Sequence, residues 1–139
     1  MKRVMSGFAK FMVLVAAVLV VSAPTLVAQG ITTKGKAVVL YGSPSNTTKP
    51  ATINYETVRK KTPEYQTIRS EGVRKGSARY ELLTSRMGAR IREAAGRAAQ
   101  SKGVDCVVRS GDIANDNGIT VVDLTGEVVA ELESGDPAA

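Results

Sequence analysis

"RKKTPEYQTIRSE", residues 59–71, interrupts a helical pattern with a proline. Inside a helix, proline removes one backbone hydrogen bond and clashes with the preceding turn, which costs roughly 3 kcal/mol. At the first position of a helix proline is favoured, and threonine is favoured as the capping residue before it. Thr62 and Pro63 therefore predict that one short helix ends here and a second begins, with Glu64 near the positive end of the new helix dipole.

Short elements are predicted on the N-terminal side of this junction. The valines of "KAVVLY" (36–41) and the pattern of "ATIN" (51–54) favour two strands, with the turn formers of 42–50 between them. Asn54 is a good N-cap for a helix that starts with "YETVRKK". Residues 29–50 as a whole are interpreted as an N-terminal extension that contains a strand and a loop.

On the C-terminal side, a longer helix follows a glycine-rich turn, "EGVRKGS". Apolar residues recur at helical spacing between 78 and 102, at Leu83, Met87, Ile91, Ala94 and Ala98. Because the outgoing segments and this helix are similar in length, they favour an antiparallel helical hairpin with arms over about 55–102. Two helices packed on a sheet in an ordinary compact domain also fit the periodicity.

After the hairpin the pattern returns to strands. "DCVV" (105–108) and "ITVV" (119–122) are the predicted strands, and "DLTGEVVAEL" (123–132) predicts a short amphipathic helix with Thr125 as its N-cap. The acidic loop between the two strands resembles an EF-hand only superficially, because no glutamate stands at the closing position. A solvated turn is expected there, and residues 134–139 form the predicted tail.

Residues 1–28 have the composition of a secretory signal peptide. Lys2, Arg3 and Lys10 precede an unbroken apolar run, and small residues follow up to Ala28. The run is shorter than the roughly 20 residues that span a bilayer. We expect cleavage after Ala28 and export to the periplasm as a chain of 111 residues, with an uncleaved N-terminal anchor as the alternative.

Composition argues against an enzyme. The chain has no histidine and one cysteine, so it lacks the commonest general base, most zinc-site patterns and any internal disulfide. Cys106 stands beside two valines, where a buried strand thiol is more common than a nucleophile. We therefore expect no catalytic residue, no metal site and no cofactor.

Charge is divided along the chain. Residues 59–102 contain 12 Lys/Arg against four Glu, a net charge of +8, whereas residues 105–139 contain one Arg against eight acids, a net charge of −7. Such asymmetry bears on partners and electrostatic steering rather than on the fold. The basic segment is the candidate binding region.

The order of these segments resembles the Skp/OmpH family of periplasmic chaperones. Members open with a strand, an acidic or amide residue and a helix that bears a Ser/Thr-Pro-Glu turn, and "INYETVRKKTPEYQTI" follows this pattern. They close with Lys-Gly-x-Asp and an apolar strand, then Asp-Ile-Thr-x-Glu-Val, which "SKGVDCVV" and "VVDLTGEVVAEL" follow. The resemblance covers about 51–133, with a shortened hairpin, and it implies structural roles for Thr62, Pro63, Asp123 and Thr125.

This resemblance implies an α+β fold in which a small β-rich body carries a projecting antiparallel helical hairpin, a short coiled coil, and assembles as a homotrimer. The small size of the body independently favours oligomerisation. The implied function is that of an ATP-independent, holdase-like chaperone that binds unfolded outer-membrane or envelope proteins. The predicted contacts are the basic residues of the arms together with one tyrosine: Arg69, Arg74, Lys75, Arg79, Tyr80, Arg86 and Arg90.

A trimeric envelope adaptor is the alternative function. In that case the basic arms bind anionic lipid or lipopolysaccharide. A basic helix can also neutralise nucleic-acid phosphates, but export argues against nucleic acid as a partner. For each basic residue named above, a solvated helix face is the alternative interpretation.

Overall fold

The computed structural model describes residues 29–135, which form an α+β fold. Its strands are β1 Thr32–Thr33, β2 Val39–Gly42, β3 Pro50–Ile53, β4 Cys106–Arg109, β5 Ile113–Asn115 and β6 Val122–Asp123. Its helices are η1 Pro44–Asn46, α1 Tyr55–Lys60, α2 Pro63–Ser70, α3 Ala78–Lys102 and α4 Thr125–Ser134. The predicted signal peptide lies outside the described residues, and so do residues 136–139 of the predicted tail.

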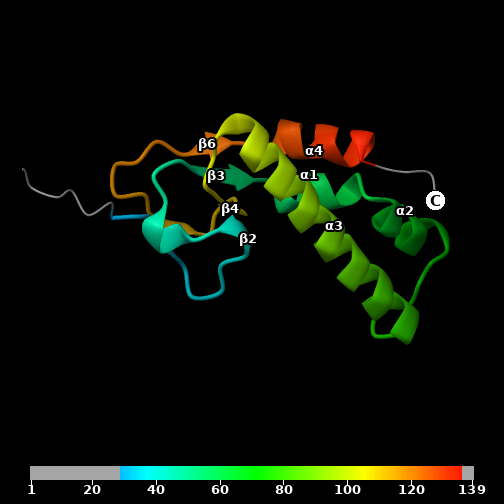
Figure 1. Ribbon diagram of the computed structural model, residues 1–139. Helices are drawn as coiled ribbons and strands as arrows, with labels where there is room; N and C mark the ends of the chain where they lie inside the picture. Colours follow the sequence, from blue (N-terminus) through cyan, green and yellow to red (C-terminus); the bar gives the residue numbers. More distant parts are fainter. Residues whose placement is uncertain (1–28, 136–139) are drawn as a thin grey trace, which may run out of the picture.

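The central sheet has the strand order β2-β4-β3-β6. Because β3 and β4 are parallel, the chain must cross back over the sheet between them, and α1, α2 and α3 form this connection. β6 lies parallel to β3 on its other side, and β2 pairs antiparallel with β4. The strands predicted at 36–41, 51–54 and 105–108 correspond to β2, β3 and β4, although β2 begins only at Val39. The solvated turn predicted between 105–108 and 119–122 is wrong in part, because β5 lies there and pairs antiparallel with β1. Figure 1 shows the strands at one end of the molecule and α2 at the other.

The strand predicted at 119–122 is wrong for most of its length. β6 begins only at Val122, where it pairs with Ala51 of β3. The backbone N–H of Ile119 donates to the Asp116 carbonyl, so this residue belongs to the turn before β6. The β-branched run therefore adds only its last residue to the sheet.

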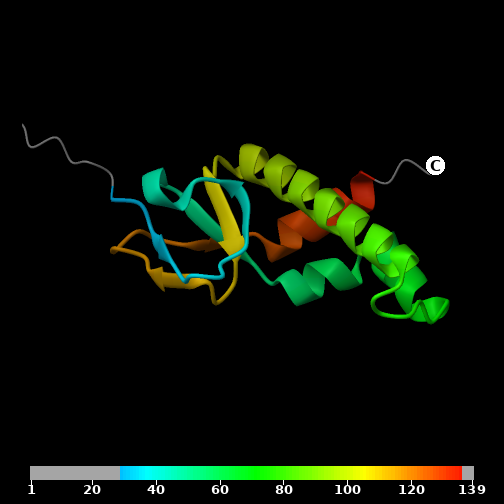
Figure 2. The same cartoon turned by 90° about the horizontal axis from the view of Figure 1, so that it is seen from below.

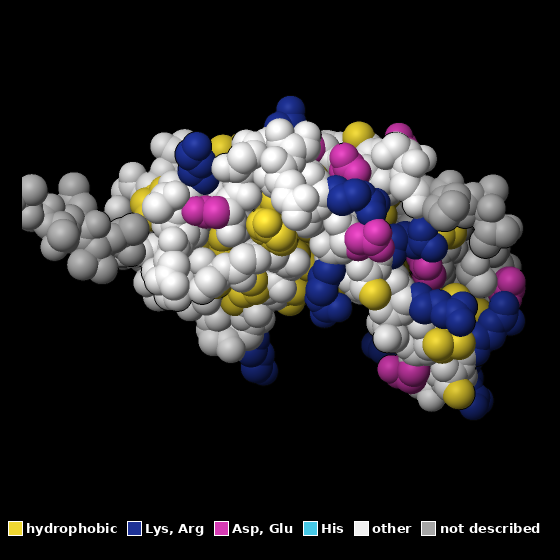
Figure 3. All heavy atoms as spheres, viewed as in Figure 1, with side chains coloured by type: hydrophobic (Ala, Val, Ile, Leu, Met, Phe, Trp, Pro, Cys, Tyr) yellow, Lys and Arg dark blue, Asp and Glu magenta, His cyan; other side chains and the backbone are white. Residues whose placement is uncertain are grey.

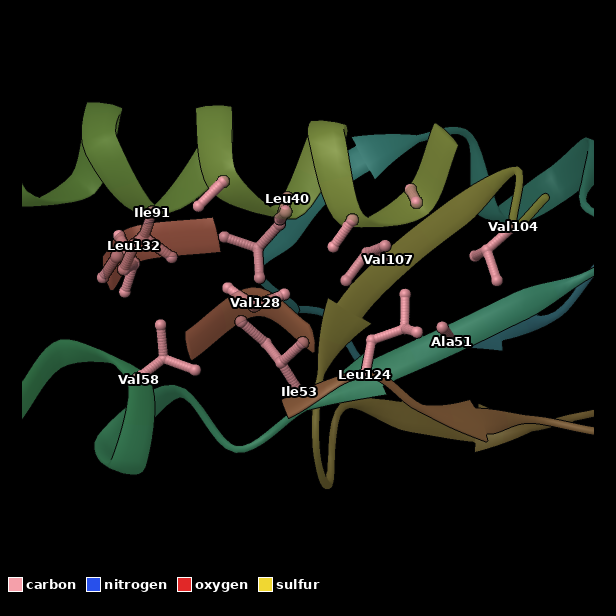
Figure 4. Close-up of a cluster of buried hydrophobic side chains, with 14 of the residues drawn as sticks. Leu40, Ala51, Ile53, Val58, Ile91, Val104, Val107, Leu124, Val128 and Leu132 are labelled. Carbon is pink, nitrogen blue, oxygen red and sulfur yellow. The ribbon is translucent and has the colours of Figure 1, made fainter. Parts of the chain in front are cut away.

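The main hydrophobic core lies between the sheet and the helices. In Figures 1 and 2, α3 and α4 lie along one side of the strands, and the buried side chains of these elements form one cluster. Figure 4 shows Ile53 and Val107 of the sheet in the same cluster as Ile91 of α3 and Val128 of α4. Ala95 is fully buried, and such small side chains let α3 approach the sheet closely.

A smaller cluster lies apart from the main core. It contains Ile31, Cys106 and Val108, with Ile113 packed against them. Burial raises the pKa of the Cys106 thiol to about 11, and the neighbouring charge of Asp105 adds to the effect. Cys106 is therefore a buried strand thiol, as its valine neighbours predicted.

The predicted break between two short helices is present. α1 ends at Lys60 and α2 begins at Pro63. The Thr62 hydroxyl accepts a hydrogen bond from the Tyr65 N–H at 3.3 Å and donates one to the Arg59 carbonyl at 2.6 Å. A buried threonine thus caps both helix ends that meet at this point.

The predicted arms, about 55–102, do not project along their whole length. Val58 of α1 and Ile91 of α3 are fully buried in the main core, whereas no residue of α3 before Met87 is buried. The inner part of the predicted hairpin belongs to the body because the alanine-rich face of α3 packs on the sheet and on α4. Only α2 and the first turns of α3 extend past the core (Figure 1).

Candidate functional site

The predicted binding residues gather at the end of the molecule away from the sheet. We call residues 69–86 the basic tip; it comprises the end of α2, the connecting loop and the first turns of α3. Figure 3 shows Lys and Arg side chains beside apolar ones at this end. The basic tip contains Arg69, Arg74, Lys75, Arg79, Tyr80 and Arg86, and Arg90 lies one turn beyond it on α3.

Two glycines and a serine cap shape the loop of the basic tip. Gly72 and Gly76 have positive φ angles of 57° and 84°, a region that residues with a Cβ disfavour. The Ser77 hydroxyl accepts from the Tyr80 N–H at 3.2 Å and donates to the Arg74 carbonyl at 2.7 Å, which begins α3. The predicted turn thus brings basic side chains of α2 and α3 to one end of the molecule.

The basic tip carries more positive charge than its own acids neutralise. Its five Lys/Arg stand against two Glu, a net charge of +3. Glu71 pairs with Arg79 across the loop. The other four basic side chains are exposed and make no ion pair within residues 29–135; they are Arg69, Arg74, Lys75 and Arg86.

Apolar side chains lie among these cations. Leu82 is 50% exposed, and Val73, Tyr80 and Leu83 are half-buried. Sequence analysis missed Leu82, since it stands outside the apolar stripe that runs through Leu83 and Met87. A large aliphatic residue off the apolar stripe of a helix was the signal that could have found it. The basic tip is thus a mixed basic and apolar surface.

Arg90 differs from the other predicted binding residues because it is tied to α2. Its Nε donates to both carboxylate oxygens of Glu64, at 3.0 and 3.2 Å. The Glu64 side chain is 8% exposed and that of Arg90 is 31% exposed. This contact gives Arg90 a structural role between α2 and α3, and its role in binding stays a prediction.

Asp123 and Thr125 join two segments of the body. The Asp123 carboxylate accepts from the Thr125 N–H at 2.8 Å and from its hydroxyl at 2.5 Å. Both hydrogen bonds lower the pKa of Asp123, and the bond from the Thr125 hydroxyl contributes more than the bond from its N–H. The Thr125 hydroxyl in turn accepts from the Asn54 N–H at 2.8 Å. Thr125 is the first residue of α4 rather than its predicted N-cap, because its hydroxyl bonds the junction of β3 and α1 instead of its own helix.

Asp105 fixes part of the N-terminal extension against β4. Its carboxylate accepts from the Thr47 hydroxyl, from the N–H and hydroxyl of Thr48 at 2.9 and 3.0 Å, and from the Lys49 N–H at 3.1 Å. Burial raises the pKa of Asp105, but these hydrogen bonds outweigh it and lower the pKa to about 2. The extension is therefore an integral part of the body, to which it also contributes β2.

Three further features of residues 29–135 concern metal ions, membranes and surface hollows. This part of the chain holds no group of three or more His, Cys, Asp or Glu that could bind a metal ion. None of its helices is long and apolar enough to cross a membrane. Shallow hollows of the body lie beside Gly30 and Asn117 and beside Tyr55 and Arg109, and no residue of the basic tip lines these.

The chain was compared with known proteins at the level of families, sequences and structures. No protein-family model, no curated protein and no solved structure matches it.

Proposed function

We propose that this protein is an exported, ATP-independent chaperone of the Skp/OmpH kind, which holds unfolded outer-membrane or envelope proteins in the periplasm. The observation that carries the proposal is the mixed surface of the basic tip, which holds four exposed cations and the half-exposed Leu82. An unfolded client offers apolar side chains and scattered charges, so it can make both kinds of contact there. Burial of apolar surface contributes about 25 cal/mol per Å², and exposed charges contribute less than about 1 kcal/mol each.

In this proposal α2, the loop and the outer turns of α3 act as a short projecting antiparallel hairpin. Three copies would assemble through their bodies and place three basic tips around a client. Such repetition suits a holdase because weak contacts at several tips raise the overall affinity without a tight single site. Light scattering of the purified chain tests this assembly, and a monomeric mass would contradict it.

The experiment that tests the function is suppression of client aggregation. An unfolded β-barrel protein is diluted from urea with and without the purified chain, and light scattering is followed at low and at high salt. We expect slower aggregation, with a smaller effect at high salt because exposed charges are screened. Unchanged aggregation at low salt would refute the proposal.

Two matched double variants distinguish the effect of the cations of the basic tip from the effect of net charge. Arg74→Gln with Lys75→Gln removes two tip cations, whereas Lys34→Gln with Lys36→Gln removes two exposed cations of the body. We expect the first pair to weaken suppression and the second to leave it unchanged. Equal losses would show that net charge, rather than the basic tip, acts on the client.

A trimeric envelope adaptor is the second candidate, and the half-exposed Leu82 beside cations favours it. Apolar side chains flanked by Lys and Arg are typical of segments that bind anionic membrane surfaces. Replacement of Arg74, Lys75 and Arg79 by glutamate should abolish sedimentation with vesicles that contain anionic lipid or lipopolysaccharide. Binding that persists in this triple variant would rule the adaptor out.

A further inference from the structure

α2 packs on the body through Tyr65, which lies against the main core, and through the polar contact of Glu64 with Arg90. The buried residue of α2 is Glu64, and the apolar side chains of this helix, Tyr65 and Ile68, are only half-buried. α1 differs, since Val58 is fully buried in the core. Elements that bury little apolar surface are those that open locally at a small cost in free energy. α2 is therefore the weakly attached helix of the connection between β3 and β4.

Both ends of α2 allow it to move as a unit. On one side α2 is separated from α1 by the break at Thr62, whose hydroxyl accepts from the Tyr65 N–H and donates to the Arg59 carbonyl. On the other side lies the loop with Gly72 and Gly76. The eight residues of α2 can thus swing away with their own hydrogen bonds intact. The contacts that must break include that of Glu64 with Arg90, the packing of Tyr65 on the main core and the bond from the Gln66 amide to the Lys60 carbonyl.

The side of α3 that faces α2 contains apolar residues. Arg90 contacts Glu64 of α2, and Met87 and Leu83, three and seven positions earlier, lie on the same side of α3. Met87 is buried and Leu83 is half-buried. Separation of the two helices would expose this stripe together with the inner side of α2.

A buried hydroxyl without a hydrogen-bond partner, on the same side of α3, favours the separation of α2 from α3. The Thr84 Oγ1 is buried and has no hydrogen-bond partner within residues 29–135. Thr84 lies three residues before Met87 and therefore on the same side of the helix. A buried hydroxyl without a partner destabilises the closed arrangement, and water can hydrate it once the helices separate.

We propose that the interface between α2 and α3 is a latent binding surface for an apolar segment of an unfolded polypeptide. α2 swings outward about Thr62 and the glycine loop, and the client segment takes its place on Leu83 and Met87. The exposed cations of the basic tip then border the segment, so segments flanked by acidic residues bind best. This inference rests on the proposed function, and it adds the location of the client and the motion that admits it.

Hydrogen exchange on the purified chain tests the opening without any client. We expect amides of α2 to exchange at least about 100-fold faster than those of 91–99 in the buried half of α3. Glu64→Gln should speed exchange in α2 about tenfold further, and Thr84→Val, of nearly the same shape, should slow it. Exchange of α2 at the rate of the core, or no response to either variant, would overturn the opening.

A chemical cross-link tests whether the opening admits the client. Glu64→Cys with Arg90→Cys is joined by a short bismaleimide, which ties α2 to α3. The matched control is Ala89→Cys with Glu93→Cys, two exposed positions one turn apart on α3, whose link restrains no second helix. Cys106 does not compete for the reagent, since it is buried and its thiol pKa is about 11.

The unfolded β-barrel protein is the client in this assay. We expect the α2–α3 link to abolish the suppression of aggregation that the same double variant shows before it is linked, while the control pair suppresses equally well before and after linking. Full suppression by the α2–α3 linked protein would refute the latent surface and leave the proposed function standing. If the wild-type chain itself fails to suppress aggregation, the proposed chaperone function is refuted, and so is the binding of a client between α2 and α3. The hydrogen-exchange experiment then still tests whether α2 separates from α3.

Discussion

A Cβ atom on Gly42 would lie 2.0 Å from the carbonyl oxygen of Asp105, and Gly42 has a φ of 69°. This glycine ends β2 and pairs with the start of β4, so the N-terminal extension meets the sheet by close backbone approach. This oxygen belongs to the backbone directly before β4, so it cannot move aside as the end of a flexible side chain can. Glycine is therefore required at this position for both its φ angle and its size.

Gly42→Ala should lower the free energy of unfolding by at least about 2 kcal/mol, because it adds strain and a clash at one position. Urea unfolding followed by circular dichroism measures the change. The control is Gly35→Ala, where a Cβ meets nothing within 4 Å and where we expect a change within about 0.5 kcal/mol. Similar losses in the two variants would contradict the prediction.

Asp105 should make stability depend on pH below about 4. Its pKa is lowered from 3.8 to about 2 in the folded chain, so its contribution is present above pH 3.8 and is lost as the pH falls through about 2. Because this residue is exposed, solvent screening reduces the effect, and we expect Asp105→Asn to cost about 1 kcal/mol at pH 7. The difference from wild type should shrink between pH 4 and pH 2 in urea titrations. Glu133→Gln, an exposed change of the same kind, serves as the control.

Thr62→Ala should cost about 1–2 kcal/mol, since the cap of α2 is lost together with the bond to the Arg59 carbonyl. Thr62→Ser keeps the hydroxyl and should recover most of this stability. Thermal and urea unfolding of the two variants provide the comparison. Equal stability of the alanine and serine variants would mean that the hydroxyl does not hold the junction.

Thr125→Val should cost about 1–3 kcal/mol, because the Asn54 N–H loses its acceptor and Asp123 loses one of its two donors. The same substitution at the exposed Thr120 is the control and should change the free energy of unfolding by less than about 0.5 kcal/mol. If Thr125→Val unfolds at the wild-type urea concentration, the link between β3 and α4 contributes nothing.

Leu82→Ser should separate binding from stability. Leu82 is 50% exposed, so its replacement should change the free energy of unfolding by less than about 0.5 kcal/mol. Leu124→Ala, which truncates a fully buried side chain, should cost about 2–5 kcal/mol. We expect Leu82→Ser to suppress client aggregation less well at unchanged stability. Undiminished suppression would remove Leu82 from the binding surface.

Local signals in the sequence predicted several elements well. α3 begins at Ala78 and ends at Lys102, as its apolar period and the following glycine indicated. The break at Thr62 and Pro63 is also where it was expected, because capping and proline geometry depend only on neighbouring residues. The run at 119–122 failed as a strand prediction, since β propensity does not show whether a partner strand is within reach.

The candidate site was predicted only in part, because sequence patterns show local features and not contacts between residues far apart in the chain. The residues of the basic tip were named from charge and from their position near a glycine turn, both of which are local features. The contact of Glu64 with Arg90 was not foreseen, because the two residues stand 26 positions apart and are brought together by the packing of α2 on α3. The same contact separates Arg90 from the exposed cations with which it was grouped.

The sequence by itself determined the bounds of α3, the break between α1 and α2 and which segment is basic, since caps, turns and periodicity are properties of neighbouring residues. The tertiary structure decided how much of the predicted hairpin packs into the body of the protein. Val58, Ile91 and Ala95 are fully buried, because the small side chains of α3 let it pack against the sheet and α4. Burial depends on residues far apart in the chain, so no local pattern could show that only α2 and the outer turns of α3 extend past the core.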